Sequence, residues 1–85
     1  MASIDEVISS IDANTQAVSE IGAQIESSKQ QAEEVLTALQ QLGIEAAGHA
    51  LSAAKDQLEE CLTQNAALAQ KLEQARGAAE ASKHA

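Results

Sequence analysis

Hydrophobic residues recur at heptad spacing through the first half of the chain. Two positions of each heptad, a and d, carry most of them, and this spacing lines one face of an α-helix that packs against another helix. The pattern predicts a helix over residues 3–42. The a positions are Ile4, Ile11, Val18, Ile25, Ala32 and Leu39, and the d positions are Val7, Asn14, Ile21, Ser28, Val35 and Leu42.

The second half repeats the pattern in a new register. It predicts a second helix over residues 49–80, followed by an Ala-rich tail, 81–85, that we expect to fray. Small residues at the d positions would let the helix axes approach closely, and Cys61 among them is interpreted as a small buried hydrophobe. The a positions are Ile44, Leu51, Leu58, Asn65, Leu72 and Ala79, and the d positions are Ala47, Ala54, Cys61, Leu68, Ala75 and Ser82.

The register breaks between the two halves. The a positions step by five residues from Leu39 to Ile44, which no regular heptad allows. Gly43 stands where a left-handed glycine commonly ends a helix, and Gly48 adds a second weak point. We therefore predict a tight reversal over residues 43–48.

These elements predict an all-α fold, an antiparallel two-helix coiled-coil hairpin that occupies residues 1–85 as a single domain. Each helix of about 40 residues would be about 60 Å long. The helix start is marked by Ser3 and Glu6, which fit a capping box. A chain of 85 residues buries little core by itself, so we expect the hairpin to assemble into a four-helix bundle. The alternative is one long helix in a parallel dimer that acts as a structural spacer.

Three apolar residues lie beside the predicted seams, at e positions: Ile8, Leu36 and Leu62. They widen the apolar stripe beyond what a strict two-helix seam requires. We interpret them as a contact for a second copy or for another helical protein. The alternative is that they thicken the contact within the hairpin.

Two asparagines, Asn14 and Asn65, interrupt the seams. A buried asparagine in a coiled coil often sets register or oligomeric state, and we assign these two a structural role at a partner or oligomer interface. In a hairpin that turns near residue 45, Asn14 would lie opposite residues 73–77 and Asn65 opposite residues 22–26. Each would then meet another chain or face a thin, hydrated part of the seam.

Composition and charge narrow the function further. The chain has no Phe, Tyr, Trp or Pro, and its net charge of −8 disfavours nucleic acid and anionic membranes as partners. No phosphate-binding loop, catalytic set or metal-ligand spacing is present, and His49 is interpreted as a solvated turn residue. We therefore expect no enzymatic activity, cofactor, metal or small-molecule substrate. Without a signal peptide or membrane span, the expected location is the cytoplasm, with leaderless secretion as the alternative.

The opening Ile4-Asp5-Glu6-Val7-Ile8, then Ile11 and Asn14, and the segment Ala38-Leu39-Gln40 before the central glycine resemble small actinobacterial helical-hairpin proteins related to type VII secretion and encoded near polymorphic toxins. The Trp-x-Gly turn of that family corresponds here to Gln41-Leu42-Gly43, without the Trp, and no tyrosine is present for an export signal. The resemblance implies a partner or chaperone-like subunit for a helical secreted protein rather than a signal-bearing substrate.

Overall fold

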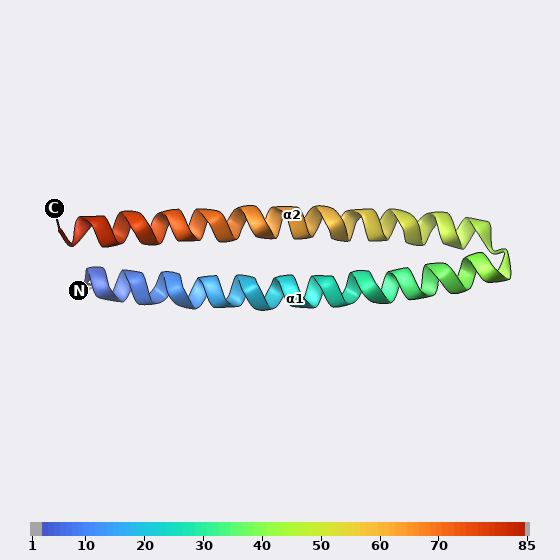
Figure 1. Ribbon diagram of the computed structural model, residues 1–85, viewed down its shortest axis with the longest axis horizontal. Coiled ribbons are helices and arrows are strands. Elements are labelled where there is room, and N and C mark those ends of the chain that lie inside the picture. Colours follow the sequence, from blue (N-terminus) through green and yellow to red (C-terminus); the bar gives the residue numbers. More distant parts are fainter. Residues whose placement is uncertain (1–2, 85) are drawn as a thin grey trace.

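The computed structural model describes residues 3–84, which form two long helices joined by a sharp turn. Helix α1 spans Ile4–Leu42 and helix α2 spans Glu45–Ser82. They run antiparallel and side by side, with both ends of the chain at one end of the molecule and the turn at the other (Figure 1). The molecule measures 63 × 16 × 14 Å. The predicted all-α hairpin is confirmed, and the alternative of one continuous helix is wrong.

The start of α1 is capped by a side chain. The Ser3 hydroxyl oxygen accepts a hydrogen bond from the backbone N–H of Glu6 at 3.1 Å, while Ser3 itself keeps an extended backbone. This bond satisfies one of the N–H groups that the first helical turn leaves without an intrahelical partner. Acidic residues Asp5 and Glu6 in the same turn also interact favourably with the positive end of the helix dipole.

The turn depends on Gly43, the one residue in the described chain with a positive φ. Its φ of 71° and ψ of 24° are left-handed, a conformation that costs side-chain-bearing residues about 1–2 kcal/mol. The Gly43 N–H donates to the carbonyl of Gln40 at 3.2 Å, and the Ile44 N–H donates to that of Leu39 at 3.0 Å. This pair of bonds is the Schellman arrangement, which ends α1 and reverses the chain within two residues.

The turn is therefore shorter than the predicted segment 43–48, because α2 already begins at Glu45. Gly48 lies inside the first turns of α2 rather than in a loop, and it is half-buried. A Cβ atom built on Gly48 would lie 3.8 Å from Leu36 Cδ1, in ordinary contact distance. An alanine would therefore fit at this position beside Leu36. At the other end α2 continues to Ser82, two residues beyond the predicted boundary, and residue 85 of the predicted tail lies outside the described residues.

The two helices meet along their a and e positions, not along a and d. Ile8, at an e position, is 7% exposed, whereas its neighbour Val7, at a d position, is 45% exposed. The d-position residues Ile21 and Val35 are likewise about half exposed. The predicted seam is therefore wrong at its d positions. The a and e positions are separated alternately by four and three residues, so they also form a heptad seam. Compared with the predicted a and d seam, each helix is rotated about its own axis by about 50°.

Candidate protein-interaction surface

The residues predicted to face a further partner lie largely within the hairpin itself. Ile8 is buried between α1 and α2, and Leu36 and Leu62 are half-buried on the same contact. Their burial favours the alternative to a partner contact, and a contact of these residues with a further protein stays a prediction. The alternative that they thicken the hairpin contact describes their location, because the e positions are part of the seam that the helices use.

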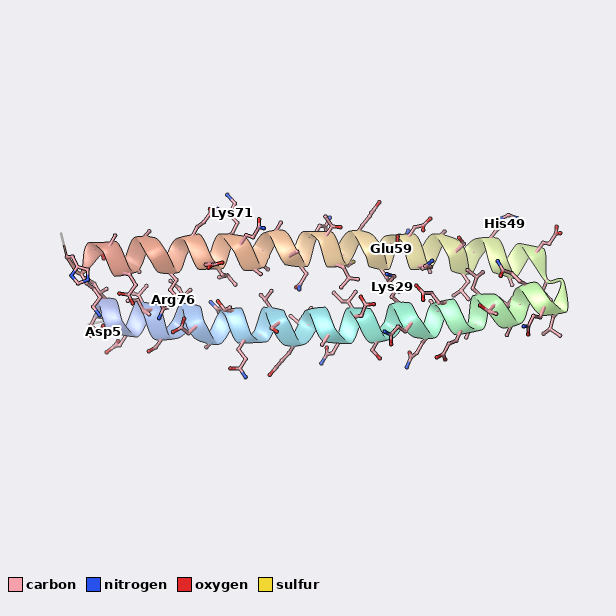
Figure 2. All side chains as sticks on the ribbon, viewed as in Figure 1. Asp5, Lys29, His49, Glu59, Lys71 and Arg76 are labelled. Carbon is pink, nitrogen blue, oxygen red and sulfur yellow. The ribbon has the colours of Figure 1, made fainter. Side chains whose placement is uncertain are left out.

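Four charged residues cross the middle of the seam and set its register. Lys29 on α1 lies 4.0 Å from Glu33 and 3.8 Å from Glu59, and Lys55 on α2 lies 3.8 Å from Glu33 and 3.9 Å from Glu59. The lysines occupy e positions, and Figure 2 shows Lys29 and Glu59 reaching toward each other across the gap between the helices. Each lysine contacts one acid on its own helix and one on the other, so a slip between the helices would break two ion pairs.

Two more ion pairs join the helices near the chain ends. The Arg76 guanidinium donates to Asp12 at 2.7 Å, and the hydrogen bond and charge of Asp12 raise the pKa of Arg76. Lys83 lies 2.9 Å from Asp5, and that hydrogen bond and charge likewise raise the pKa of the Lys83 amine. Like the central pairs, these pairs join a basic residue at an e position to an acid at a b position.

The b positions of both helices therefore share one side of the hairpin, since the same lysines reach acids on α1 and on α2. We call this side the acidic edge. Eight of the chain's 13 acids occupy these b positions, directly beside the seam. Its members are Asp5, Asp12, Glu26 and Glu33 on α1, and Glu45, Glu59, Glu73 and Glu80 on α2.

The opposite side of the hairpin is apolar. On a heptad helix whose a and e positions face its neighbour, the b and d positions flank the contact on opposite sides. Because the b positions of the two helices share one side, their d positions share the other. We call these d-position residues the apolar face, and nearly all of them are exposed. Its apolar members are Val7, Ile21, Val35 and Leu42 on α1, and Ala47, Ala54, Cys61, Leu68 and Ala75 on α2, and its polar members are Asn14, Ser28 and Ser82.

The two asparagines have different surroundings. Asn65 lies opposite Gly22, within the range expected from a hairpin, and its side-chain N–H donates to the backbone carbonyl of Val18 at 3.1 Å. That bond places Asn65 inside the hairpin contact rather than at an outer interface. Asn14 is exposed and occupies a d position in the row of the apolar face. Its predicted role at a partner interface stays a prediction.

Cys61 is exposed, so its interpretation as a buried hydrophobe is wrong. The reason is the rotation of the seam, which turns every d position of α2 outward. His49 is also exposed, as expected, but it belongs to α2 rather than to the turn and points away from α1 (Figure 2).

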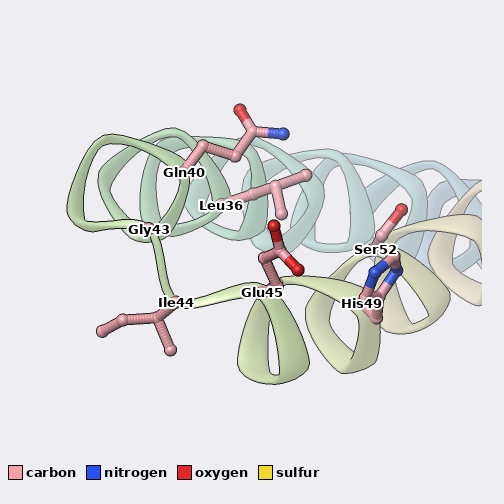
Figure 3. A pocket seen from close by; sticks show the side chains of 8 residues that line it. Leu36, Gln40, Gly43, Ile44, Glu45, His49 and Ser52 are labelled. Carbon is pink, nitrogen blue, oxygen red and sulfur yellow. The ribbon is translucent and has the colours of Figure 1, made fainter.

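A pocket lies at the turn end, where the last turns of α1 meet the first turns of α2 (Figure 3). Its lining combines apolar Leu36 and Ile44 with the polar side chains of Gln40, Glu45 and Ser52. Among the described residues, no three His, Cys, Asp or Glu side chains gather as a metal site would require. Neither helix, over the residues described, has a stretch long and apolar enough to span a bilayer.

Sequence reasoning missed the apolar face because it assigned the d positions to the seam. The signal that distinguishes the two arrangements is the placement of charge. Basic residues Lys29, Lys55 and Arg76 all fall at e positions, and acids recur at the b positions next to them. When the e positions lie in the contact between the helices, their basic side chains can reach the b-position acids of the other helix, as observed. The d positions carry no charged residue in either helix.

Comparison with known protein families, with curated proteins and with solved structures finds no match for this chain.

Proposed function

We propose that this protein is a non-enzymatic interaction module that binds another helical surface, either its own second copy or a different protein, through the apolar face. The observation that carries the proposal is the exposure of Val7, Ile21 and Val35, each 45–51% exposed, in one row. The polar residues Asn14 and Ser28 lie between them, and the neighbouring row on α2 is apolar at every d position from Ala47 to Ala75. Scattered apolar residues are common on protein surfaces, but a contiguous apolar strip bordered by polar residues is typical of interaction sites.

The arrangement of charge supports the same proposal. The acids next to the seam lie on the acidic edge, on the other side of the hairpin. Binding through the apolar face would therefore desolvate few charged groups, whose burial is costly unless they are paired. Helix-on-helix contact of this kind needs apolar residues at repeated heptad positions, which the face supplies.

Photo-crosslinking in cells that make the protein tests this proposal. A photoreactive amino acid would replace Ile21 on the apolar face or, as the matched control, Ser27 on the outer side of α1. We expect covalent adducts from position 21 and few from position 27. Equal yields at the two positions, or no adduct from position 21, would overturn the proposal.

The mass of the adduct also identifies the class of partner. An adduct of twice the chain mass indicates a second copy. An adduct with the leading helical segment of a secreted toxin is the outcome that the resemblance to type VII secretion proteins implies. Either adduct supports an interaction module. The mass of the adduct shows whether the protein binds its own second copy or a different protein.

A further inference from the structure

The apolar face consists of two rows of different side-chain size. The row on α1 carries the large residues Val7, Ile21, Val35 and Leu42, with the polar residues Asn14 and Ser28 between them, whereas the row on α2 carries alanine or cysteine at every apolar position except Leu68. The two rows run side by side along the hairpin because they are the d positions of antiparallel neighbours. A surface with a large row beside a small row can complement a second, inverted copy of itself.

We propose that a second copy of this chain covers the apolar face and that the two hairpins form a symmetric four-helix bundle. This inference rests on the proposed function and names its partner. The two-fold axis runs parallel to the helices, so that α1 of each copy lies over α2 of the other and both turns are at the same end. Such a face-to-face interface is isologous and closes on itself as a dimer.

Side-chain size selects this axis over the alternative. A two-fold axis perpendicular to the helices would place α1 over α1 and α2 over α2, and so large side chains over large and small over small. The bundle would then be wide on one side and narrow or poorly filled on the other, and unfilled space in a core costs stability. The parallel axis sets the large residues Val7, Val35 and Leu42 against small residues of the other copy and keeps the helix spacing more even.

The heights of the residues along the hairpin agree with this arrangement. Ion pairs place Arg76 level with Asp12 and Lys55 level with Glu33. In that register Cys61 lies level with residue 27, beside Ser28, and Leu68 lies level with residue 20, beside Ile21. A parallel axis leaves every height unchanged, so each α2 residue of one copy would lie over the α1 residue at its own height in the other, with Ala54 over Val35 and Ala47 over Leu42. Leu68 would then meet Ile21, the one height at which two large residues of the rows face each other.

Charge also favours a second copy, although each chain carries a net charge of −8. None of the 13 acids occupies a d position or the outward g positions beside them, the rows that begin at Ser10 and Ala50. Lys71 is the one charged residue in these four rows, and glutamine and alanine make up most of the border. Two strongly acidic chains can therefore meet on their uncharged sides while the acidic edges point outward into solvent, where salt screens them.

The available area is sufficient. The hairpin exposes 6061 Å², whereas a compact monomer of 8.8 kDa exposes about 4,800 Å², so roughly 1,300 Å² lies exposed beyond the compact expectation. A standard interface buries about 800 Å² per partner, and one face of the hairpin extends over 63 by 16 Å. Only Ile8, Val18 and Ala32 are buried among the described residues, so a second copy would supply the core that one hairpin lacks.

The first test measures mass and its dependence on the apolar face. Multi-angle light scattering of the purified chain should give twice the chain mass of 8.8 kDa. Ile21→Glu would bury a carboxylate in each half of the interface and should raise the dissociation constant at least 100-fold. The matched variant Ser27→Glu, with the same added charge on the outer side, should remain a dimer. Circular dichroism checks that both variants stay helical.

The second test uses cysteine to determine the axis. A Ser28→Cys, Cys61→Ser chain is mixed with the wild-type chain, so that each chain holds one thiol, and an oxidant is added. The parallel axis predicts a covalent dimer in the mixture, because residue 28 of one copy lies over Cys61 of the other. The matched chain Ser27→Cys, Cys61→Ser should give little product.

Two results would overturn the inference. A monomer throughout the micromolar range would exclude the second copy, while adducts to another protein from position 21 would leave the proposed function standing. A dimer in which wild-type chains alone form a Cys61–Cys61 disulfide would indicate the perpendicular axis, which brings the middles of the two α2 helices together, and would refute the arrangement proposed here.

Discussion

Substitution by alanine should change the unfolding free energy differently at Gly22 and at Gly77, two glycines inside helices. The difference measures the contribution of the Asn65 side chain, which lies against Gly22. Alanine in place of an unhindered helical glycine stabilises a protein by about 0.5–1 kcal/mol, because glycine loses more backbone entropy on folding. Apart from its chain neighbours and the backbone of its own helix, no atom lies within 4 Å of where a Cβ on Gly77 would stand. Gly77→Ala should therefore gain about 1 kcal/mol of unfolding free energy.

Gly22→Ala should gain little or lose stability. A Cβ on Gly22 would lie 2.7 Å from Asn65 Nδ2, a distance that real Cβ atoms essentially never show. The amide would have to move away and release its hydrogen bond to the Val18 carbonyl, which is worth about 0.5–1.5 kcal/mol. This loss offsets the entropic gain, so Gly22→Ala should be about 1 kcal/mol less stable than Gly77→Ala.

A double-mutant cycle isolates the cause. In an Asn65→Ala background nothing obstructs the new methyl group, so Gly22→Ala should then gain as much as Gly77→Ala does. Urea unfolding followed by circular dichroism at one fixed protein concentration gives all the free energies needed. Equal effects of the two glycine substitutions in the wild-type chain would refute the reasoning. So would a deficit at Gly22 that persists after Asn65 is removed.

Three further predictions concern the turn and the chain ends. Gly43→Ala should lower the unfolding free energy by about 1–2 kcal/mol, because its φ of 71° is left-handed, and urea unfolding measures the loss. Ser3→Ala should cost about 1 kcal/mol by removing the cap bond to the Glu6 N–H, with Ser3→Asp restoring most of it. Asp5 raises the pKa of Lys83, so this pair stabilises the fold below the ordinary lysine pKa of 10.5 and loses its effect as pH rises through the raised pKa. The difference in melting temperature between wild type and Lys83→Gln should therefore be largest near neutral pH and vanish in strong base, whereas a difference independent of pH would contradict an ionic role.

The functional proposal depends on a feature that neither helix has alone. One helix supplies the large row and the other supplies the small row, and they become one surface only because the hairpin places them side by side. The acidic edge arises in the same way from the b positions of both helices. A protein with one uncharged apolar side and one strongly acidic side can associate through the first while the second keeps the assembly soluble.

Local chemistry made several features predictable from sequence. The Ser3 cap and the left-handed Gly43 follow from interactions within four or five residues, and both are confirmed. The hairpin also follows from sequence, because Gly43 ends one heptad series and Ile44 begins another. The length of the turn was not predictable from composition alone. Gly48 looked like a loop residue, but it lies in α2, half-buried near Leu36, which is 12 residues earlier on the other helix.

The sequence by itself therefore determined that there are two helices, where they begin and reverse, and that each has an apolar side. It did not determine which part of that side faces the other helix, because apolar residues at a, d and e allow two seams that differ by about 50° of rotation. Only the tertiary structure decided between them, through contacts between residues far apart in the chain. Lys29 reaches Glu59, Arg76 reaches Asp12, and Asn65 fits against Gly22. Since these contacts exist only with the a and e positions inward, the d positions turn outward and become the surface available to a partner.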